Sequence, residues 1–148
     1  MEISDFLSLN CVIRDTDCHS KKDALDRLAK TIADSDSATS QSEVYDCLLA
    51  RERLGSTGLG KGIAIPHGRL QQGKKTLAAF LRLQNAVDYD ASDKQPVDLL
   101  FALIVPEEAT DEHLQILAKL AEMFSQDSVV TNLRKATTPE ELYSILTE

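Results

Sequence analysis

One segment of the sequence holds residue types whose spacing could carry chemistry: RERLGSTGLGKGIAIPHGRL, from Arg51 to Leu70. Near its end His67 stands between Pro66 and Gly68, after a run that holds four glycines. A neutral imidazole is a competent nucleophile toward phosphorus when a hydrogen bond holds its other nitrogen. The proline stiffens the backbone before the histidine, and the glycine leaves its other flank uncrowded. On spacing alone, a phosphoryl acceptor and an ordinary loop histidine at a tight turn are equally good interpretations.

The glycines before the histidine suggest a loop that binds an anion through its backbone. Closely spaced glycines let N–H groups approach an anion without interference from side chains, and neighbouring hydroxyls add donors. A nucleotide-binding P-loop is disfavoured, because Gly62 stands where that motif needs a serine or threonine hydroxyl for magnesium. The residues expected to support a phosphoryl group are Ser56, Thr57, Gly58 and Gly60.

Composition narrows the classes of partner. Of 148 residues, 24 are acidic and 16 are basic, which gives a formal net charge of −8. An acidic surface repels nucleic-acid phosphates and anionic lipid, so neither is an expected partner. No apolar run approaches the ~20 residues of a membrane span, and the acidic N-terminus is unlike a signal peptide. We therefore expect a cytoplasmic protein without direct membrane insertion.

The cysteines and histidines show no metal-site pattern. Cys11, Cys18 and Cys47 are odd in number and form no CxxC pair, which disfavours a disulfide framework and a zinc site. Free thiols of this kind are typical of a reducing cytosol. The three histidines, which also lack metal-ligand spacing, are His19, His67 and His113. We expect no bound metal.

The hydrophobic pattern changes along the chain in the order helices, strands, helices. Apolar residues at helical spacing predict helices over residues 20–33 and 42–53. Strands are predicted at residues 63–65, 77–83 and 97–105. Three helices are predicted after them: one that follows Thr110, then 127–135 and 138–146. This order predicts a single domain over residues 1–148, with an α/β sandwich in which helices cover a sheet.

Local signals support these boundaries. Ser20 caps the first helix with Asp23 completing a capping box, and Thr138 starts the last helix. Residues 97–105 read VDLLFALIV, as expected of a strand covered on both faces. Thr110 is expected to cap the helix that it precedes. The residues of that helix expected to face the core are Leu114, Leu117, Leu120, Ala121 and Phe124.

The glycine-rich segment resembles the active-site signature of the mannitol/fructose class of phosphotransferase enzyme IIA domains, also called EIIA type 2, and within it the nitrogen-regulatory type. The likeness continues in SKKDALDRLA, QPVDLLFALIVP, EHLQILAKLAE and EELYSIL, so it covers nearly the whole chain. It implies the mannitol-type IIA fold, a single domain whose central mixed β-sheet is flanked by helices. It also implies that His67 is phosphorylated at Nε2, with His113 and Arg51 beside it.

The residues alone leave the roles of these two neighbours open. His113 falls in the first turn of its predicted helix and shares a face with Leu117, so it is expected to point inward. A histidine at the edge of the core is the simpler interpretation of that pattern. Arg51 and Arg53 are equally capable of meeting an anion, and only the resemblance favours Arg51. Arg69 and Lys61 are expected on the rim that a partner protein touches, or as solvated loop charges.

The resemblance also implies a function. An HPr-like (NPr) phosphocarrier protein would donate its phosphoryl group to His67, and the phosphorylation state would select regulatory target proteins. No cofactor is expected, because phosphorus on a histidine nitrogen is already activated. Whether such a component counts as an enzyme stays open. One alternative is a sugar-transport IIA component that passes phosphate to a IIB partner, and another is a binding module that is not phosphorylated.

Overall fold

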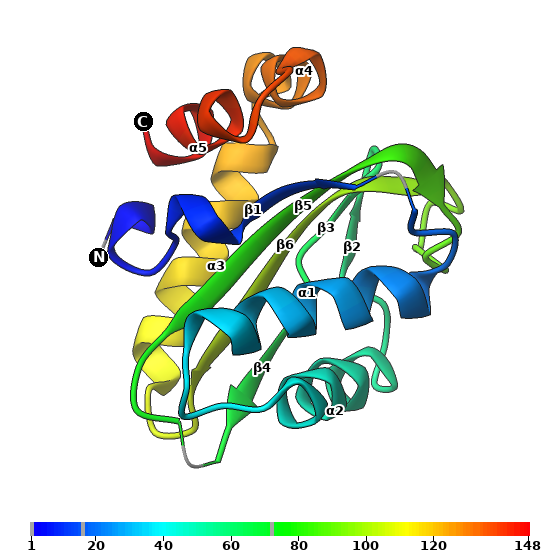
Figure 1. Cartoon of the computed structure of the whole chain (residues 1–148). Coiled ribbons are helices and arrows are strands. Elements are labelled where there is room, and N and C mark those ends of the chain that lie inside the picture. Colours follow the sequence, from blue (N-terminus) through cyan, green and yellow to red (C-terminus); the bar gives the residue numbers. More distant parts are fainter. Residues whose placement is uncertain (1, 16, 72) are drawn as a thin grey trace.

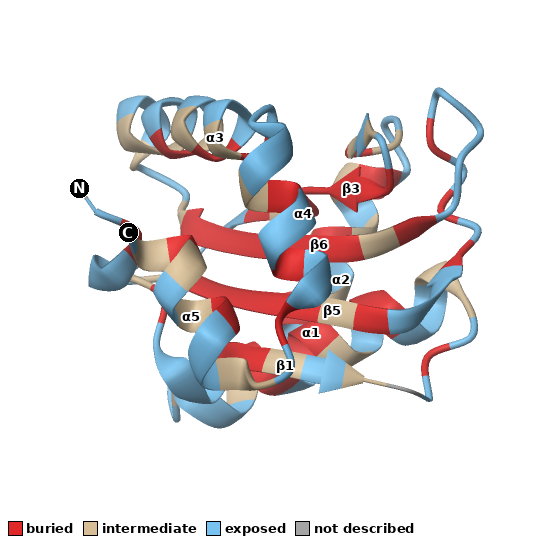
Figure 2. Cartoon of the chain, turned by 90° about the horizontal axis from the view of Figure 1, so that it is seen from above, coloured by how far each residue is buried: buried red, intermediate tan, exposed pale blue. Residues whose placement is uncertain are grey.

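Strand β6 (Val97–Pro106) forms the centre of the fold in the computed structural model. From Leu99 to Val105 every residue of this strand is buried, and Figure 2 shows it enclosed between other elements. The prediction of a strand covered on both faces is therefore confirmed. The residues that the structure describes are 2–15, 17–71 and 73–148.

The sheet around β6 is mixed. On one side, β5 (Leu77–Val87) runs antiparallel to β6. On the other side, β3 (Ile63–Ala64) and β4 (His67–Leu70) run parallel to its first and second halves. β1 (Val12–Asp15) lies parallel to β5, and β2 (Gly58–Gly60) lies antiparallel to β3. The predicted central mixed sheet is confirmed.

Helices cover both faces of this sheet (Figure 1). α1 (Lys21–Ser35) and α2 (Gln41–Glu52) pack side by side on one face, and α3 (Thr110–Phe124) lies on the other. α4 (Asp127–Lys135) and α5 (Pro139–Thr147) follow, and α5 packs near β1. All five predicted helices are present. Within the described residues, no helix combines the length and apolarity that crossing a bilayer requires.

The N-terminal segment completes the face that α3 covers. Two short 3-10 helices, η1 (Ile3–Asp5) and η2 (Leu9–Cys11), precede β1. The ring centroids of Phe101 in β6 and Phe124 in α3 are 6.3 Å apart, and those of Phe6 and Phe101 are 6.5 Å apart. The five α-helices and the sheet contribute buried apolar residues to one continuous core. This packing holds α2 and α3 against opposite faces of the sheet.

Side-chain caps set the starts of three helices. The hydroxyl of Ser20 accepts a hydrogen bond from the backbone N–H of Asp23, and that of Thr138 accepts one from the N–H of Glu141. Both predicted caps are confirmed. α2 starts slightly earlier than predicted, because Ser40 provides the cap by accepting from the N–H of Glu43.

The start and the buried face of α3 differ from the prediction. Ala109, rather than Thr110, is the N-cap, because a turn from Pro106 to Ala109 leads directly into the helix. α3 buries a narrow stripe at i, i+4 and i+8 against the sheet, so the predicted core residues Leu114 and Ala121 face outward. The fully buried residues are Ile116, Leu120 and Phe124.

Three strands were not predicted from the hydrophobic pattern of the sequence. β1, β2 and β4 have only three or four residues each, which is too short for alternation to stand out. β5 was predicted, but it continues beyond residue 83 to Val87.

Candidate functional site

His67 is the first residue of β4, and this strand pairs only with β6 within the part of the chain that the structure describes. The histidine therefore lies on an edge strand rather than at a tight turn in a loop. Its register is fixed from inside the sheet, since it stands opposite Leu103, whose N–H donates to the carbonyl of Pro66 at 3.0 Å. A rigid strand thus carries the imidazole at an open edge of the sheet.

Gly68 allows α2 to approach this strand closely. A Cβ at this position would lie 2.5 Å from the Sγ of Cys47 and 3.1 Å from the carbonyl oxygen of Cys47. The thiol of Cys47 donates to the carbonyl oxygen of Arg69 at 3.3 Å, which ties the helix to the strand edge. The side of the strand opposite His67 is therefore packed against α2, and the glycine is required for that contact.

A hydrogen bond sets the protonation of the His67 ring. Nδ1 lies 2.7 Å from the carbonyl oxygen of Ile65. Because a carbonyl oxygen can only accept, Nδ1 must carry the proton, which leaves the lone pair on Nε2. Burial lowers the pKa of His67, and the charge of Arg51 lowers it further, against opposing effects of the Ile65 hydrogen bond and Glu52. The ring is consequently neutral near pH 7, with a nucleophilic nitrogen available.

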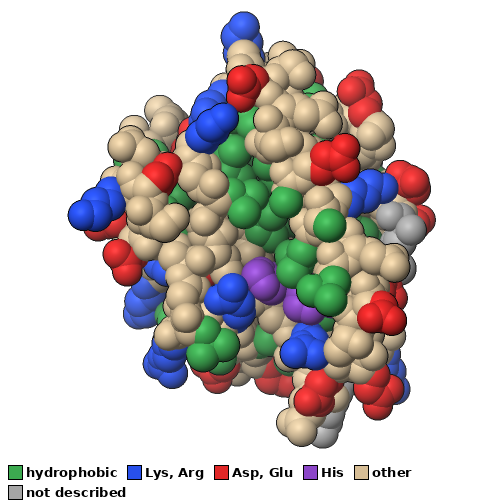
Figure 3. Space-filling view, turned by 180° about the vertical axis from the view of Figure 1, so that it is seen from behind, with side chains coloured by type: hydrophobic (Ala, Val, Ile, Leu, Met, Phe, Trp, Pro, Cys, Tyr) green, Lys and Arg blue, Asp and Glu red, His purple; other side chains and the backbone are tan. Residues whose placement is uncertain are grey.

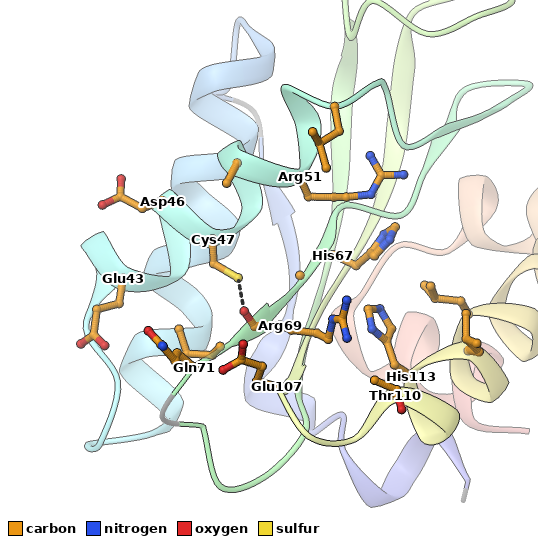
Figure 4. A pocket seen from close by; sticks show the side chains of 16 residues that line it. Glu43, Asp46, Cys47, Arg51, His67, Arg69, Gln71, Glu107, Thr110 and His113 are labelled. Carbon is orange, nitrogen blue, oxygen red and sulfur yellow. Dashed lines mark hydrogen bonds between the residues drawn. The ribbon is translucent and has the colours of Figure 1, made fainter.

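Three further nitrogen-bearing side chains lie around this ring (Figure 4). Arg51 at the end of α2, Arg69 of β4 and His113 of α3 line the same pocket as His67. The His67 and His113 rings meet edge to face, with centroids 5.3 Å apart and planes at 76°. Figure 4 shows the His67 imidazole between the guanidinium of Arg51 and the side chains of Arg69 and His113. Side chains from helices on opposite faces of the sheet thus gather around the His67 imidazole.

His113 is held neutral with a free hydrogen-bonding atom. Burial, with smaller effects of His67 and Arg69, lowers its pKa to about 4. Its Nε2 is buried and has no hydrogen-bond partner among the described residues. An unpaired buried polar atom is costly and calls for an explanation. A group that enters the pocket with hydrogen-bonding oxygens would supply the missing partner.

The structure separates the two candidate arginines. Arg51 lines the pocket, and its Nη1 donates to the carbonyl oxygen of Gly55 at 2.9 Å. Arg53 is exposed at the end of α2 and does not line the pocket. Of the two alternatives, only Arg51 is brought beside His67.

The four loop residues expected to support a phosphoryl group do not line this pocket. The backbone N–H of Thr57 donates to Glu52, as does its hydroxyl, and the N–H of Gly58 donates to the hydroxyl of Ser56. Gly58 also packs against Ala91, where a Cβ would come within 2.8 Å. These donors are bonded to Glu52 of α2 and to Ser56. Gly58 therefore allows close packing instead of presenting its amide beside His67.

The two predicted rim charges also separate. Arg69 lines the pocket, as expected of a residue two positions after His67 on the same strand. Lys61 does not, and its exposed ammonium lies 3.7 Å from the carboxylate of Asp127. The predicted rim at His67 therefore includes Arg69 but not Lys61.

The pocket is a wide groove between α2 and α3. Its volume is about 1300 Å³, above the ~300–1,000 Å³ usual for small-molecule sites. Two exposed leucines border the groove: Leu54 is 84% exposed and Leu114 is 67% exposed. Figure 3 shows hydrophobic side chains gathered around the two histidines. Sequence reasoning missed this border, because a single leucine after a helix, or on a helix assigned to the core, gives no signal of exposure.

Acidic side chains line another part of the groove. These residues are Glu43 and Asp46 of α2 and Glu107, which follows β6. The groove therefore carries cationic and imidazole groups around His67, with carboxylates and leucines on its remaining walls. Such a mixture suits a protein surface better than a small anion, which would meet the carboxylates unfavourably.

Comparison with known proteins agrees with this geometry. The pattern of the family described as "Phosphoenolpyruvate-dependent sugar phosphotransferase system, EIIA 2" matches residues 5–148. A "Nitrogen regulatory protein" from Escherichia coli (strain K12) is 40% identical over 149 residues, covering 100% of this chain and 91% of the relative. The crystal structure of the nitrogen regulatory protein IIA-Ntr from Neisseria meningitidis is 44% identical, with a TM-score of 0.93 over 98% of this chain and 99% of that one.

More distant relatives carry sugar-specific names. The crystal structure of IIA mannitol from Escherichia coli is 21% identical and has a TM-score of 0.79 over 95% of this chain and 98% of that one. This likeness confirms the mannitol-type fold. A "PTS system fructose-specific EIIA component" from Haloferax volcanii is 31% identical over 147 residues, covering 99% of this chain and 96% of the relative.

Proposed function

The chain belongs to the phosphoenolpyruvate-dependent sugar phosphotransferase system EIIA 2 family, and we propose that within it this protein is a regulatory phosphocarrier that accepts its phosphoryl group on His67. The observation that carries the proposal is the hydrogen bond from Nδ1 of His67 to the carbonyl oxygen of Ile65. That bond leaves the Nε2 lone pair available in a groove that Arg51 and His113 also line.

The proposed reaction moves a phosphoryl group between two imidazoles. The lone pair of His67 Nε2 attacks the phosphorus of a phosphohistidine on an HPr-like (NPr) carrier. As the new N–P bond forms, the old one breaks, and its electron pair returns to the nitrogen of the donor histidine. The Nδ1 proton of His67 stays on Nδ1, in its hydrogen bond to the Ile65 carbonyl oxygen. The donor imidazole leaves as a neutral ring because its other nitrogen carries a proton, so neither ring has to gain or lose one. Positioning and electrostatic stabilisation therefore supply the catalysis.

The neighbours of His67 match the charge of the transferred group. Arg51 and Arg69 provide fixed positive charge, and the unpaired Nε2 of His113 provides a hydrogen-bonding atom. Positive and N–H partners stabilise a phosphoryl group in transfer. We assign His67 as acceptor, with Arg51 and His113 as the residues that touch the transferring group.

The groove suits a protein donor. Burying Leu54 and Leu114 at an interface would remove apolar surface from water, and both leucines lie on the groove that contains His67. We propose that the carrier docks across this border, and that regulatory target proteins use the same surface. Phosphorylation adds about −1.5 to −2 charges there, which would alter the affinity of each target.

We propose the cytoplasm as its location, with residues 1–148 acting as one unit. Cys11, Cys18 and Cys47 are all free thiols, which suits a reducing compartment.

Phosphoryl uptake tests the proposal. Purified protein incubated with phosphorylated HPr-like carrier should form an acid-labile, base-stable phosphoramidate, and His67→Ala should abolish it. If His67→Ala is labelled as strongly as the wild type, the site assignment is wrong. If the wild type takes up no phosphate, the chain is a binding module that is not phosphorylated.

A sugar-transport role is the second candidate, favoured by the likeness to a fructose-specific EIIA component. In that case phosphorylated protein would pass its phosphoryl group rapidly to a IIB protein. Mixing it with purified IIB proteins and following the label separates the two roles. Rapid transfer to one IIB favours transport, and retention of the label with phosphorylation-dependent target binding favours regulation.

A further inference from the structure

A second polar cluster lies next to the groove and is closed to solvent. Glu52 follows Arg51 at the end of α2, yet it is only 8% exposed and does not line the groove. Its Oε1 accepts from the hydroxyls of Thr57 and Tyr89, the latter at 2.9 Å. Its Oε2 accepts from the N–H of Thr57 at 3.3 Å and pairs with the ammonium of Lys21 at 2.8 Å. Each oxygen of this buried carboxylate therefore has two partners.

The cluster is also held from the side of Lys21. The ammonium of Lys21 lies 4.3 Å from the centroid of the Tyr89 ring, in a cation–π contact. The Tyr89 side chain is itself fully buried. Burying a carboxylate is costly unless it is paired and hydrogen-bonded, and this one has both a counter-charge and three hydrogen bonds. The position of Glu52 is thus fixed from several elements at once.

Hydrogen bonds connect this carboxylate to the His67 ring. Glu52 holds the N–H of Thr57, and the carbonyl oxygen of Thr57 accepts from the N–H of Ile65 at 3.1 Å. The carbonyl oxygen of Ile65 then accepts from Nδ1 of His67 at 2.7 Å. The atom that fixes the protonation of His67 therefore belongs to a residue that the Glu52 cluster holds in place.

We propose that Glu52 is a positioning residue for phosphoryl transfer: through Thr57 and Ile65 it holds His67 as the Nδ1–H tautomer, with Nε2 free for the phosphoryl group. The consequence for transfer rests on the proposed function of His67 as acceptor. The consequence for the ring does not, because it is a property of the protein before any phosphate arrives.

The electrostatics of the ring support this role. The charge of Glu52 raises the pKa of His67, and the charge of Arg51 lowers it. Two adjacent residues of α2 thus act on the ring in opposite directions, one from the groove and one from the buried cluster. Loss of the Glu52 charge should leave the lowering effects of burial and Arg51 less opposed, so the pKa of His67 should fall.

The test compares Glu52→Gln with Glu122→Gln, read by ¹⁵N NMR of the His67 imidazole in the full chain. Glutamine keeps the shape of Glu52 but offers one acceptor oxygen where the carboxylate offers two. Glu122 is exposed on α3 and does not line the groove, so its variant removes the same charge from a site without this role. The wild type and Glu122→Gln should show one Nδ1–H tautomer.

Glu52→Gln should show a second tautomer and a lower His67 pKa. Its phosphoryl uptake from phosphorylated carrier should be slower by about ten-fold or more, because small misplacements of a reacting group are expensive. A folded Glu52→Gln protein that keeps the wild-type tautomer, pKa and transfer rate would overturn the proposal and leave Glu52 as a stabilising residue only.

Thr57→Val is a milder variant that tests the positioning role of Glu52 if Glu52→Gln fails to fold. Thr57→Val keeps the size of the side chain but removes the hydroxyl bond to Glu52, leaving the 3.3 Å amide bond as the direct link to the loop. We expect a detectable second tautomer of His67, and a single unchanged tautomer would refute the proposal. Failure of the wild type to accept phosphate would contradict the proposed function while leaving these NMR outcomes decisive.

Discussion

Two polar clusters, to which the adjacent residues Arg51 and Glu52 contribute, differ in how their hydrogen-bonding capacity is used. Around Glu52 each carboxylate oxygen has two partners, and the cluster is buried. Around His67 one nitrogen keeps its lone pair, and the buried Nε2 of His113 has no partner among the residues described. Folded proteins pair nearly all buried polar groups, so unpaired ones tend to mark places where a further group binds. In the proposed function, the satisfied cluster supports the site and the unsatisfied one carries out the phosphoryl transfer.

Removing a charge or donor from the unsatisfied cluster should have the largest kinetic effect. Arg51→Ala and His113→Ala should each slow phosphoryl uptake by ~10²–10³, the usual loss when a positioned donor leaves a transfer site. Quench-flow transfer from labelled carrier measures this rate, with circular dichroism to confirm folding.

Arg53→Ala provides the control, because it removes the same side chain from the same helix end outside the groove. It should transfer at the wild-type rate. If a folded Arg51→Ala or His113→Ala variant also transfers at that rate, the residue concerned is structural.

Adding a methyl group where α2 packs against β4 should lower the stability of the fold. In Gly68→Ala the new methyl group would lie 2.5 Å from the Sγ of Cys47 and 3.1 Å from its carbonyl oxygen. We expect a loss of about 1–3 kcal/mol in the free energy of unfolding, as for other overpacked sites, measured by urea denaturation. Gly55→Ala is a useful comparison, since a Cβ there meets nothing within 4 Å although its φ of +150° is one that glycine favours. Equal stability of Gly68→Ala and the wild type would show that α2 is free to move away from β4.

Filling the groove with a phosphoryl group should shift the titration of His113. Its pKa is about 4, compared with 6.5 for an unperturbed histidine, so the folded protein favours the neutral ring and loses stability as pH falls from about 6.5 toward 4. A phosphoryl dianion favours the charged ring, so the pKa should rise by about one unit or more on phosphorylation. Titration by NMR in both states measures it, and an unchanged pKa would place the phosphoryl group away from His113.

Changing the border of the groove should have the smallest effect. Leu114→Ser should weaken carrier binding about five-fold, the cost of losing part of one leucine side chain from an interface. Leu59→Ser is the matched control, because Leu59 is also exposed but does not line the groove. Calorimetry with the carrier compares them, and equal affinities for the two variants would exclude Leu114 from the interface.

The sequence predicted much of the frame of this molecule. The run VDLLFALIV is apolar enough to predict a strand buried on both faces. The hydroxyls of Ser20 and Thr138 predict the starts of their helices, which they cap in the structure. His67 could also be chosen from the sequence as a candidate site residue, because proline and glycine flank it. These signals are local, so they can be read without knowing the fold.

The remaining features depend on contacts between distant segments. Glu52 stands between two arginines at a helix end, a pattern typical of solvated charge, and only its packing against Lys21 and Tyr89 explains its burial. Gly58 and Gly60 were expected in an anion-binding loop, because sequence alone shows neither that they lie outside the groove nor that the Gly58 amide is paired with Ser56. Leu114 was assigned to the core, because a helical face can be read from sequence but its buried width cannot.

The most direct test of the proposed acceptor is to identify which nitrogen of His67 takes up the phosphoryl group. Protein labelled with ¹⁵N should be phosphorylated by its carrier and examined under basic conditions by ³¹P–¹⁵N correlation NMR. The hydrogen bond from Nδ1 to Ile65 predicts a coupling between phosphorus and Nε2 of His67, and no signal in His67→Ala. Phosphate on Nδ1, or on any residue other than His67, would contradict the central claim that the backbone of Ile65 selects the reacting nitrogen.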